Sequence, residues 1–252
     1  MAWLASCSND DEYTGNEQDE RVAVSFSGGM GNVATSDTQN DPNLKTSADG
    51  TQWLADDEIG IFMKYSNNGE IVDDASNRQY EAVLNSSISN FTPAEDSQTL
   101  YFPPDKNVSF IAYYPYKADL NNYIYPVDIT NQSDPAKLDM LYCKTIDYNR
   151  YTPIVTLPFN HKLCRIVLNF VPSGSVTQLN LQQLTANNVT FQGFLTKTNV
   201  NLETGEVADG TDQRMFNPIK SASPPSSVGA QFTAILVPQK KQASHKLSIR
   251  FT

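Results

Sequence analysis

Histidine and nucleophile motifs are scarce in this sequence, which argues against hydrolytic chemistry. Only two histidines occur in its 252 residues, His161 and His245, and there is no Gly-x-Ser-x-Gly motif. A hydrolase triad needs a histidine between a carboxylate and a nucleophile, and His161, at the start of a predicted strand, is expected to be a structural or a surface histidine. Acidic clusters at 56–58 and 73–74 lie in turn-like segments and are interpreted as solvated. The chain is therefore predicted not to be an enzyme.

Basic residues are outnumbered, and long apolar runs are missing. There are 18 lysines and arginines against 28 acidic residues, which gives a net charge of −10. A surface of this sign repels phosphate backbones and anionic lipid headgroups, so we expect neither a nucleic-acid partner nor electrostatic attachment to a membrane. No apolar run reaches about 18 residues, the length that a membrane-spanning helix needs. Any membrane anchor should then be covalent.

Cysteine is nearly absent, with Cys7, Cys143 and Cys164 as the three examples. Their spacing does not fit a zinc site, and the acidic turn at 209–212 lacks the spacing of an EF-hand, so no metal and no cofactor is expected. Cys143 and Cys164 lie in apolar, strand-like runs, which favours two buried thiols. A disulfide between them remains the alternative.

Short apolar strands separated by turn residues dominate the rest of the chain. Hydrophobic residues make up 39% and aromatic residues 10% of the sequence, enough for a substantial core. The predicted strands are Arg21–Phe26, Ile59–Tyr65, Gln79–Leu84, Thr99–Phe102, Val108–Tyr114, Thr152–Leu157, Leu163–Val171, Gln178–Leu184, Val189–Leu195, Gln231–Val237 and Lys246–Phe251. Lys137–Lys144 fits either a strand or a helical turn. Regularly spaced short strands predict an all-β protein built from sandwiches or barrels.

The two halves of the chain share this pattern, because Arg165–Phe170 repeats the residue types of Arg21–Phe26. We therefore predict one domain over residues 21–160 and a second over 161–252. The last predicted strand stops at the end of the sequence, so the second domain is expected to be incomplete. Residues 8–20 are acidic and without periodicity, which indicates a flexible tether.

The first residues resemble the lipobox of bacterial lipoproteins. Leu4-Ala5-Ser6 precedes Cys7, and small residues at positions 5 and 6 suit a signal-peptidase site. The resemblance implies a lipid on Cys7, so that residues 1–20 form a lipobox and tether. A chance tetrapeptide is the alternative.

Several segments, in a fixed order, resemble the fimbrillin families of Bacteroidota. Trp53–Phe62 is similar to the family pattern W..gD.IGi.m, and Leu100–Pro103 with Phe110–Tyr116 is similar to yyP…dfyAyyPy. The other matching segments are Asn77–Tyr80, Leu138–Tyr142, Leu157–Leu163, Val200–Gly205 and Leu236–Gln239. Each fragment is weak alone, and their order is the specific feature.

The resemblance implies two tandem transthyretin-like β-sandwich domains and export to the outer membrane and cell surface as a lipid-anchored protein. Such proteins are structural or adhesive pilus components (tip, base or stalk), with other subunits as partners through β-strand donation. A host or bacterial surface ligand is a further expected partner. Stalk subunits are processed after an arginine; here Arg21 precedes the first strand and Arg78 follows it. Neither position fits a stalk subunit clearly, which favours a tip or accessory role.

A surface glycan-binding lipoprotein is the alternative function. Trp53, Tyr113 and Tyr116 would then stack on sugar rings. The tyrosines also suit a core or a domain interface, which is the favoured interpretation for them.

Overall fold

The computed structural model describes residues 21–30, 52–120, 122–239 and 247–252. The first strands are β1 (Ser25–Met30), β2 (Glu58–Tyr65), β3 (Arg78–Ala82), β4 (Ile88–Pro93), β5 (Val108–Tyr114), β6 (Ile124–Asp128), β7 (Leu141–Tyr148) and β8 (Ile154–His161). The later ones are β9 (Cys164–Phe170), β10 (Val189–Gln192), β11 (Leu195–Asn201), β12 (Glu206–Val207), β13 (Thr211–Gln213), β14 (Ile219–Lys220), β15 (Ala230–Leu236) and β16 (Ser248–Phe251). The helices are α1 (Pro135–Leu138), α2 (Gln178–Gln182) and the 3-10 turns Asp96–Gln98 and Ala186–Asn188.

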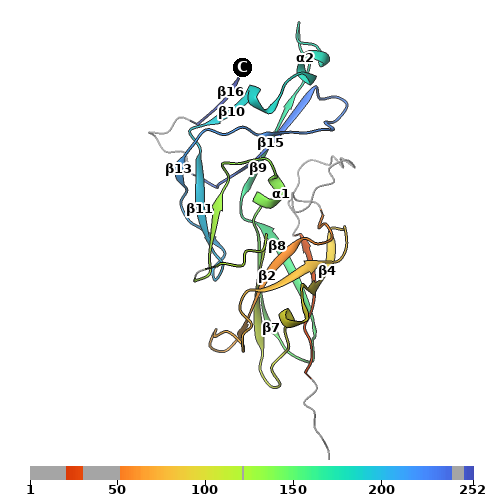
Figure 1. Cartoon of the computed structure of the whole chain (residues 1–252), viewed down its shortest axis with the longest axis vertical. Helices are drawn as coiled ribbons and strands as arrows, with labels where there is room; N and C mark the ends of the chain where they lie inside the picture. The colour runs from red at the N-terminus through yellow and green to blue at the C-terminus, as the bar shows by residue number, and fades with distance from the viewer. Residues whose placement is uncertain (1–20, 31–51, 121, 240–246) are drawn as a thin grey trace, which may run out of the picture.

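Seven strands close into a ring in the order β1-β4-β3-β2-β5-β7-β8. Neighbouring strands are antiparallel, except that β1 and β8 run parallel over six residue pairs, from Ser25–Ile154 to Met30–Phe159. The ring encloses the first hydrophobic core, which is rich in aromatic side chains. In Figure 1 its labelled strands occupy the lower half of the molecule.

Strands β2 and β5 are buried on both faces. Successive side chains of a strand point to opposite sides, so Ile61 and Phe110 enter the first core while Phe62, Ile111 and Tyr113 enter the second. A strand covered on both sides needs a continuous apolar run rather than an alternating one. This explains why β5 is the most aromatic strand of the chain.

The remaining strands form three smaller sheets around the second core (Figure 1). Strand β11 pairs with β6 along one edge and with β12 and β13, while β15 lies between β14 and β9, and β10 pairs with β16. β6 lies within residues 21–160, yet it pairs with β11. The predicted boundary near residue 160 stays a prediction, and β6 and its neighbours pack on the second core.

A polar link also joins the ring to these sheets. The Lys64 ammonium on β2 lies 2.5 Å from Oε1 of Glu203, and Lys144 on β7 donates to the Glu203 carbonyl oxygen at 3.1 Å. Glu203 belongs to the turn between β11 and β12. The second core and this turn therefore hold the ring and the smaller sheets together.

The predicted all-β, sandwich-type fold is confirmed, with local corrections. β1 continues to Met30, although its glycines predicted a break after Phe26; pairing on both sides carries the strand through them. The strand predicted at Gln178–Leu184 is wrong, because Thr177 and Asn180 form a capping box that starts helix α2. Lys137–Lys144 contains both alternatives, the end of α1 and the start of β7. Among the described residues no helix is long and apolar enough to span a membrane.

Candidate functional site

Strand β1 fills a groove between β4 and β8, which we call the β1 groove. Its side chains alternate, so that Val24, just before the strand, and Phe26 are buried, whereas Ser25 is exposed. The Phe26 ring meets Tyr80 and Phe110 edge-to-face, with ring centroids 5.1 and 5.2 Å apart. Burying a phenylalanine of this kind contributes about 1.5–3 kcal/mol. Side-chain burial and two backbone ladders therefore both hold β1 in place.

Trp53 covers the far end of this groove. Its Nε1 donates a hydrogen bond to the Gly28 carbonyl oxygen at 3.1 Å, and its ring lies 5.1 Å from both Phe91 and Phe159. A Cβ atom on Gly28 would come within 2.7 Å of the Phe91 ring and 3.0 Å of the Phe159 ring. This position of β1 therefore requires glycine, because the aromatic rings occupy the space of a side chain.

Two of the residues predicted to stack on sugars are core residues. Trp53 and Tyr113 are fully buried, so neither ring has a face open to a ligand, and that assignment is corrected. Tyr116 is partly exposed and keeps some ring surface at the protein boundary.

Tyr113 instead organises a polar network at the junction of the two cores. Its hydroxyl donates to Asn77 Oδ1 at 2.6 Å, and Asn77 Nδ2 donates to the Lys117 carbonyl oxygen at 2.9 Å. Burial raises the pKa of Tyr113, mainly because the phenolate would lose its hydration. The residues Asn77 and Tyr113, singled out separately by sequence resemblance, thus meet in space.

The structure describes the two arginines considered for processing but not the residue predicted to be lipidated. Cys7 lies outside the described residues. Arg21 is exposed, and its guanidinium lies 4.9 Å from the centre of the Tyr101 ring, just before the chain pairs with segment 100–102. Arg78 begins β3, a strand paired with β2 and with β4, and its Nη1 donates to the Ser97 carbonyl oxygen.

A cleft of about 1000 Å³ lies beside the ring, at the edge of the β6–β11 sheet, and we call it the inter-sheet cleft. The ring contributes the acidic turn 56–58 and segment 114–117. The sheet contributes β6, residues 197–199 of β11 and the turn to β13. Asp57 is held in the wall by the Leu54 backbone N–H at 2.8 Å and by the Tyr114 hydroxyl at 3.2 Å. Its burial raises the pKa of this carboxyl.

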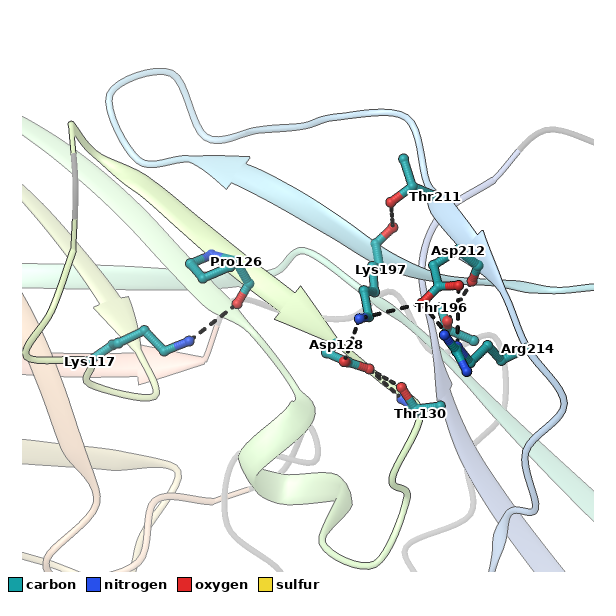
Figure 2. A network of polar contacts seen from close by, with 9 residues as sticks. All are labelled: Lys117, Pro126, Asp128, Thr130, Thr196, Lys197, Thr211, Asp212 and Arg214. Carbon is teal, nitrogen blue, oxygen red and sulfur yellow. Dashed lines mark hydrogen bonds and ion pairs between the residues drawn. The ribbon is translucent and has the colours of Figure 1, made fainter.

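Lys197 occupies the sheet side of the cleft between two carboxylates (Figure 2). Its Nζ lies 3.4 Å from Oδ2 of Asp128 and 3.4 Å from Oδ2 of Asp212. Arg214 Nε lies 3.1 Å from the same Asp212 oxygen. Hydrogen bonds to Asp212 and Asp128 raise the pKa of Lys197, and the bond from Arg214 is the main cause that lowers the pKa of Asp212. The charges of this wall therefore hold one another in position.

The acidic turn at 209–212, which lacks the spacing of an EF-hand, meets this network at Asp212. Asp212 is engaged by cationic side chains rather than free for a metal. Within the described ranges no group of three or more potential ligands could hold a metal ion.

The remaining sequence predictions concern His161 and the cysteines. His161 Nδ1 lies 2.9 Å from Oδ2 of the buried Asp139, where β8 ends, which agrees with a structural role. Cys143 is a buried free thiol as predicted, and its burial raises its pKa. Cys164 is also free but exposed, so its predicted burial is wrong; it starts β9 next to the buried Leu163, and neighbouring side chains point to opposite faces.

Most of the cleft residues carry no local signal in the sequence. The acidic turn at 56–58 was interpreted as solvated, and Asp128, Lys197 and Asn199 carried no motif. They come from segments far apart in the chain, so no local spacing could have found them.

The sheets define a class of fold, the multi-sheet β-sandwich proteins. Residues 46–252 match the Fimbrillin-like family, and the chain belongs to that family. It is 31% identical over 205 residues to "Putative fimbrium subunit Fim1C" of Bacteroides uniformis, covering 80% of this chain and 62% of that protein. The chain thus spans about three-fifths of that relative.

Solved structures agree with this assignment. A "putative cell adhesion protein" from Bacteroides uniformis superposes with a TM-score of 0.66 at 27% identity, covering 92% of this chain and 80% of that one. A protein with the same description from Bacteroides ovatus has a TM-score of 0.66 at 19% identity, covering 92% and 83%, and shows the fold alone. The predicted resemblance is confirmed. These relatives are described as fimbrial or cell-adhesion proteins, which implies a cell-surface location.

Proposed function

We propose that this protein is a lipid-anchored, structural or adhesive component of a bacterial pilus, joined to neighbouring subunits by strand exchange. Family membership supports the fimbrial role. Strand exchange is supported by the position of β1, a single strand paired with β4 on one side and with β8 on the other. A strand between two others is replaceable by a strand of another subunit, because backbone ladders supply affinity without regard to sequence.

The β1 groove would impose a side-chain pattern on any incoming strand. Its walls accept apolar residues where Val24 and Phe26 now lie, and they leave no room for a side chain at the place of Gly28. Alternate side chains enter the groove, so the pattern is apolar, aromatic, glycine at every second position. Backbone pairing would provide the affinity, and the positions of Val24, Phe26 and Gly28 would provide the specificity.

The positions of Arg21 and Arg78 relate to the place of the subunit in the pilus, because stalk subunits would be cut after an arginine. Arg21 is exposed and precedes the first pairing of the chain, so a protease could reach the bond after it, and that cut would leave β1 in place. Arg78 lies in a strand with partners on both sides, where an extended substrate conformation is not free for a protease. Since cleavage at neither arginine would free the β1 groove, we favour a tip or accessory subunit, in which an incoming strand would have to displace an intact β1.

The test is a gel of the native cell-surface fraction, run in SDS with and without boiling and probed for this chain. Strand-exchanged polymers are expected to give a ladder, or a single larger complex for a tip subunit, that collapses only on boiling. A monomer band in both lanes would rule out strand exchange.

The lipid anchor rests on Cys7 and has its own test. Cells expressing the full-length precursor are labelled with a fatty-acid analogue, and Cys7→Ala is expected to abolish the label. Cys164→Ala is the matched control and should keep it, because that exposed thiol lies in the folded part. Undiminished labelling of Cys7→Ala would remove the anchor from the proposal.

A further inference from the structure

The inter-sheet cleft has the size and placement of a ligand site. Its volume of about 1000 Å³ is at the upper end of small-molecule pockets, and it lies beside the junction of separately packed sheets, where such sites concentrate. Its two walls come from the ring and from β6 and β11, which the second core fixes relative to each other. The cleft is therefore preformed rather than opened by a ligand.

The free edge of β6 argues against a peptide strand as the occupant. In the part of the chain that the structure describes, β6 pairs with β11 alone, so its other edge is unpaired. Pro126 stands in the middle of that strand and has no N–H to give to an added strand. The Pro126 carbonyl oxygen already accepts a hydrogen bond from Lys117 Nζ at 3.5 Å. Strand addition at this edge is blocked.

The charges of the cleft argue against an acidic or a purely apolar occupant. Five carboxylates and three lysines line it, so its net charge is negative and anionic ligands are repelled. Lys197 is held between Asp128 and Asp212, so its charge is largely balanced within the wall. Most of the residues around the cleft carry polar or charged groups, which an apolar ligand would leave without partners.

The aromatic and hydrogen-bonding groups of the two walls indicate which kind of ligand fits the cleft. Tyr116 is half-buried against the second core and lines the wall that the seven-stranded ring contributes; its backbone N–H donates to the Glu58 carbonyl oxygen at 2.9 Å. Asn199 is exposed on the opposite wall, in register with Pro126. An amide both donates and accepts, a carboxylate accepts, and an ammonium donates. A ligand with many hydroxyl groups and an apolar C–H face satisfies all of these at once.

We propose that the inter-sheet cleft binds a neutral or amino-bearing oligosaccharide, with Tyr116 stacked on a sugar ring. Asp57, Lys197 and Asn199 would bond its hydroxyl groups from both walls. The inference does not depend on strand exchange, because β1 does not line the cleft.

The test begins with the purified full chain on an array that holds neutral, amino-bearing, sialylated and sulfated oligosaccharides. The neutral or amino-bearing probe with the strongest signal is then measured by calorimetry. We expect micromolar to millimolar binding that weakens at least tenfold in Tyr116→Ala and in Asn199→Ala. Tyr151→Ala is the matched control: Tyr151 is 82% exposed in the turn between β7 and β8, outside the cleft, and its loss should leave binding unchanged.

Each variant is checked for its fold by circular dichroism and its melting temperature. Asn199 tests the site even if Tyr116→Ala is destabilised, because its side chain is exposed. No binding by the folded wild-type chain, binding of sialylated or sulfated probes alone, or equal loss in the Tyr151 control would each overturn the proposal.

Discussion

Gly60 on β2 and Tyr113 on β5 are register partners, and the Tyr113 ring lies directly over the Gly60 backbone. A Cβ atom at Gly60 would overlap the ring. The absence of that one carbon lets the tyrosine lie flat along the sheet and reach Asn77 with its hydroxyl. This pair sets the junction between the ring and the second core.

Gly60→Ala should destabilise the protein strongly. The new methyl group would push the buried Tyr113 ring out of its place and break its hydrogen bond to Asn77. Overpacking of this kind costs about 1–3 kcal/mol, and a lost buried hydrogen bond about 1 kcal/mol more. Urea unfolding followed by fluorescence would measure the loss.

Gly29→Ala is the control for that measurement, because a Cβ there would lie 3.4 Å from its nearest neighbour, an ordinary contact. Equal stability of the two variants would contradict the packing argument.

Gly28→Ala should weaken the hold of the β1 groove on its strand. A Cβ would lie 2.7 Å from the buried Phe91 ring, so the strand or the rings must shift, at a cost of about 1–3 kcal/mol. Hydrogen exchange of the β1 amides is expected to accelerate in this variant by tenfold or more. The neighbouring Gly29→Ala should leave those rates within about twofold, and comparable acceleration in both would show that the groove does not select for glycine.

Alkaline pH should unfold the protein through its buried tyrosines. Burial raises the pKa of Tyr80 and of Tyr125 to about 12, above the ordinary value of 10. The contribution of these two hydroxyls to the free energy of unfolding is fully present below pH 10. It is lost as pH rises from 10 to 12, since the unfolded chain releases the phenol protons at lower pH than the folded chain does. The free energy of unfolding should fall by about 1.4 kcal/mol per pH unit for each such tyrosine.

Urea titrations at pH 8, 10 and 11, with absorbance at 295 nm to follow phenolate formation, would check this. In Tyr80→Phe the free energy of unfolding should fall less steeply with pH, because one of the titrating tyrosines is gone. Its baseline stability should also drop, because the Leu100 backbone N–H loses its 2.8 Å bond to the Tyr80 hydroxyl. A stability independent of pH over this range would contradict the burial of these hydroxyls.

The two thiols of the folded region should react at different rates. In a chain carrying Cys7→Ser, Ellman's reagent is expected to modify Cys164 rapidly, because it is exposed. Cys143 should react only on unfolding, since burial both shields it and raises its pKa. Two thiols modified at the same rate, or none until a reductant is added, would contradict the two free cysteines.

Local sequence patterns identified the strands whose environment is uniform. β5 was placed residue for residue, because an apolar and aromatic run ended by Pro115 has few other structures available. The helix at Gln178–Gln182 was missed, since its start depends on a capping box rather than on periodicity. β4 and β6 were also missed, as both contain a proline, which is rare inside strands.

The sequence by itself determined the all-β class, the aromatic core and the family. Each of these follows from residue types and from short-range order along the chain. Tertiary structure alone decided that Trp53 and Tyr113 are buried, that β1 lies between β4 and β8, and that Asp57, Lys197 and Asn199 share a cleft. Pairing between distant strands sets these relationships, and the spacing of residues along the chain carries no record of which strands will pair.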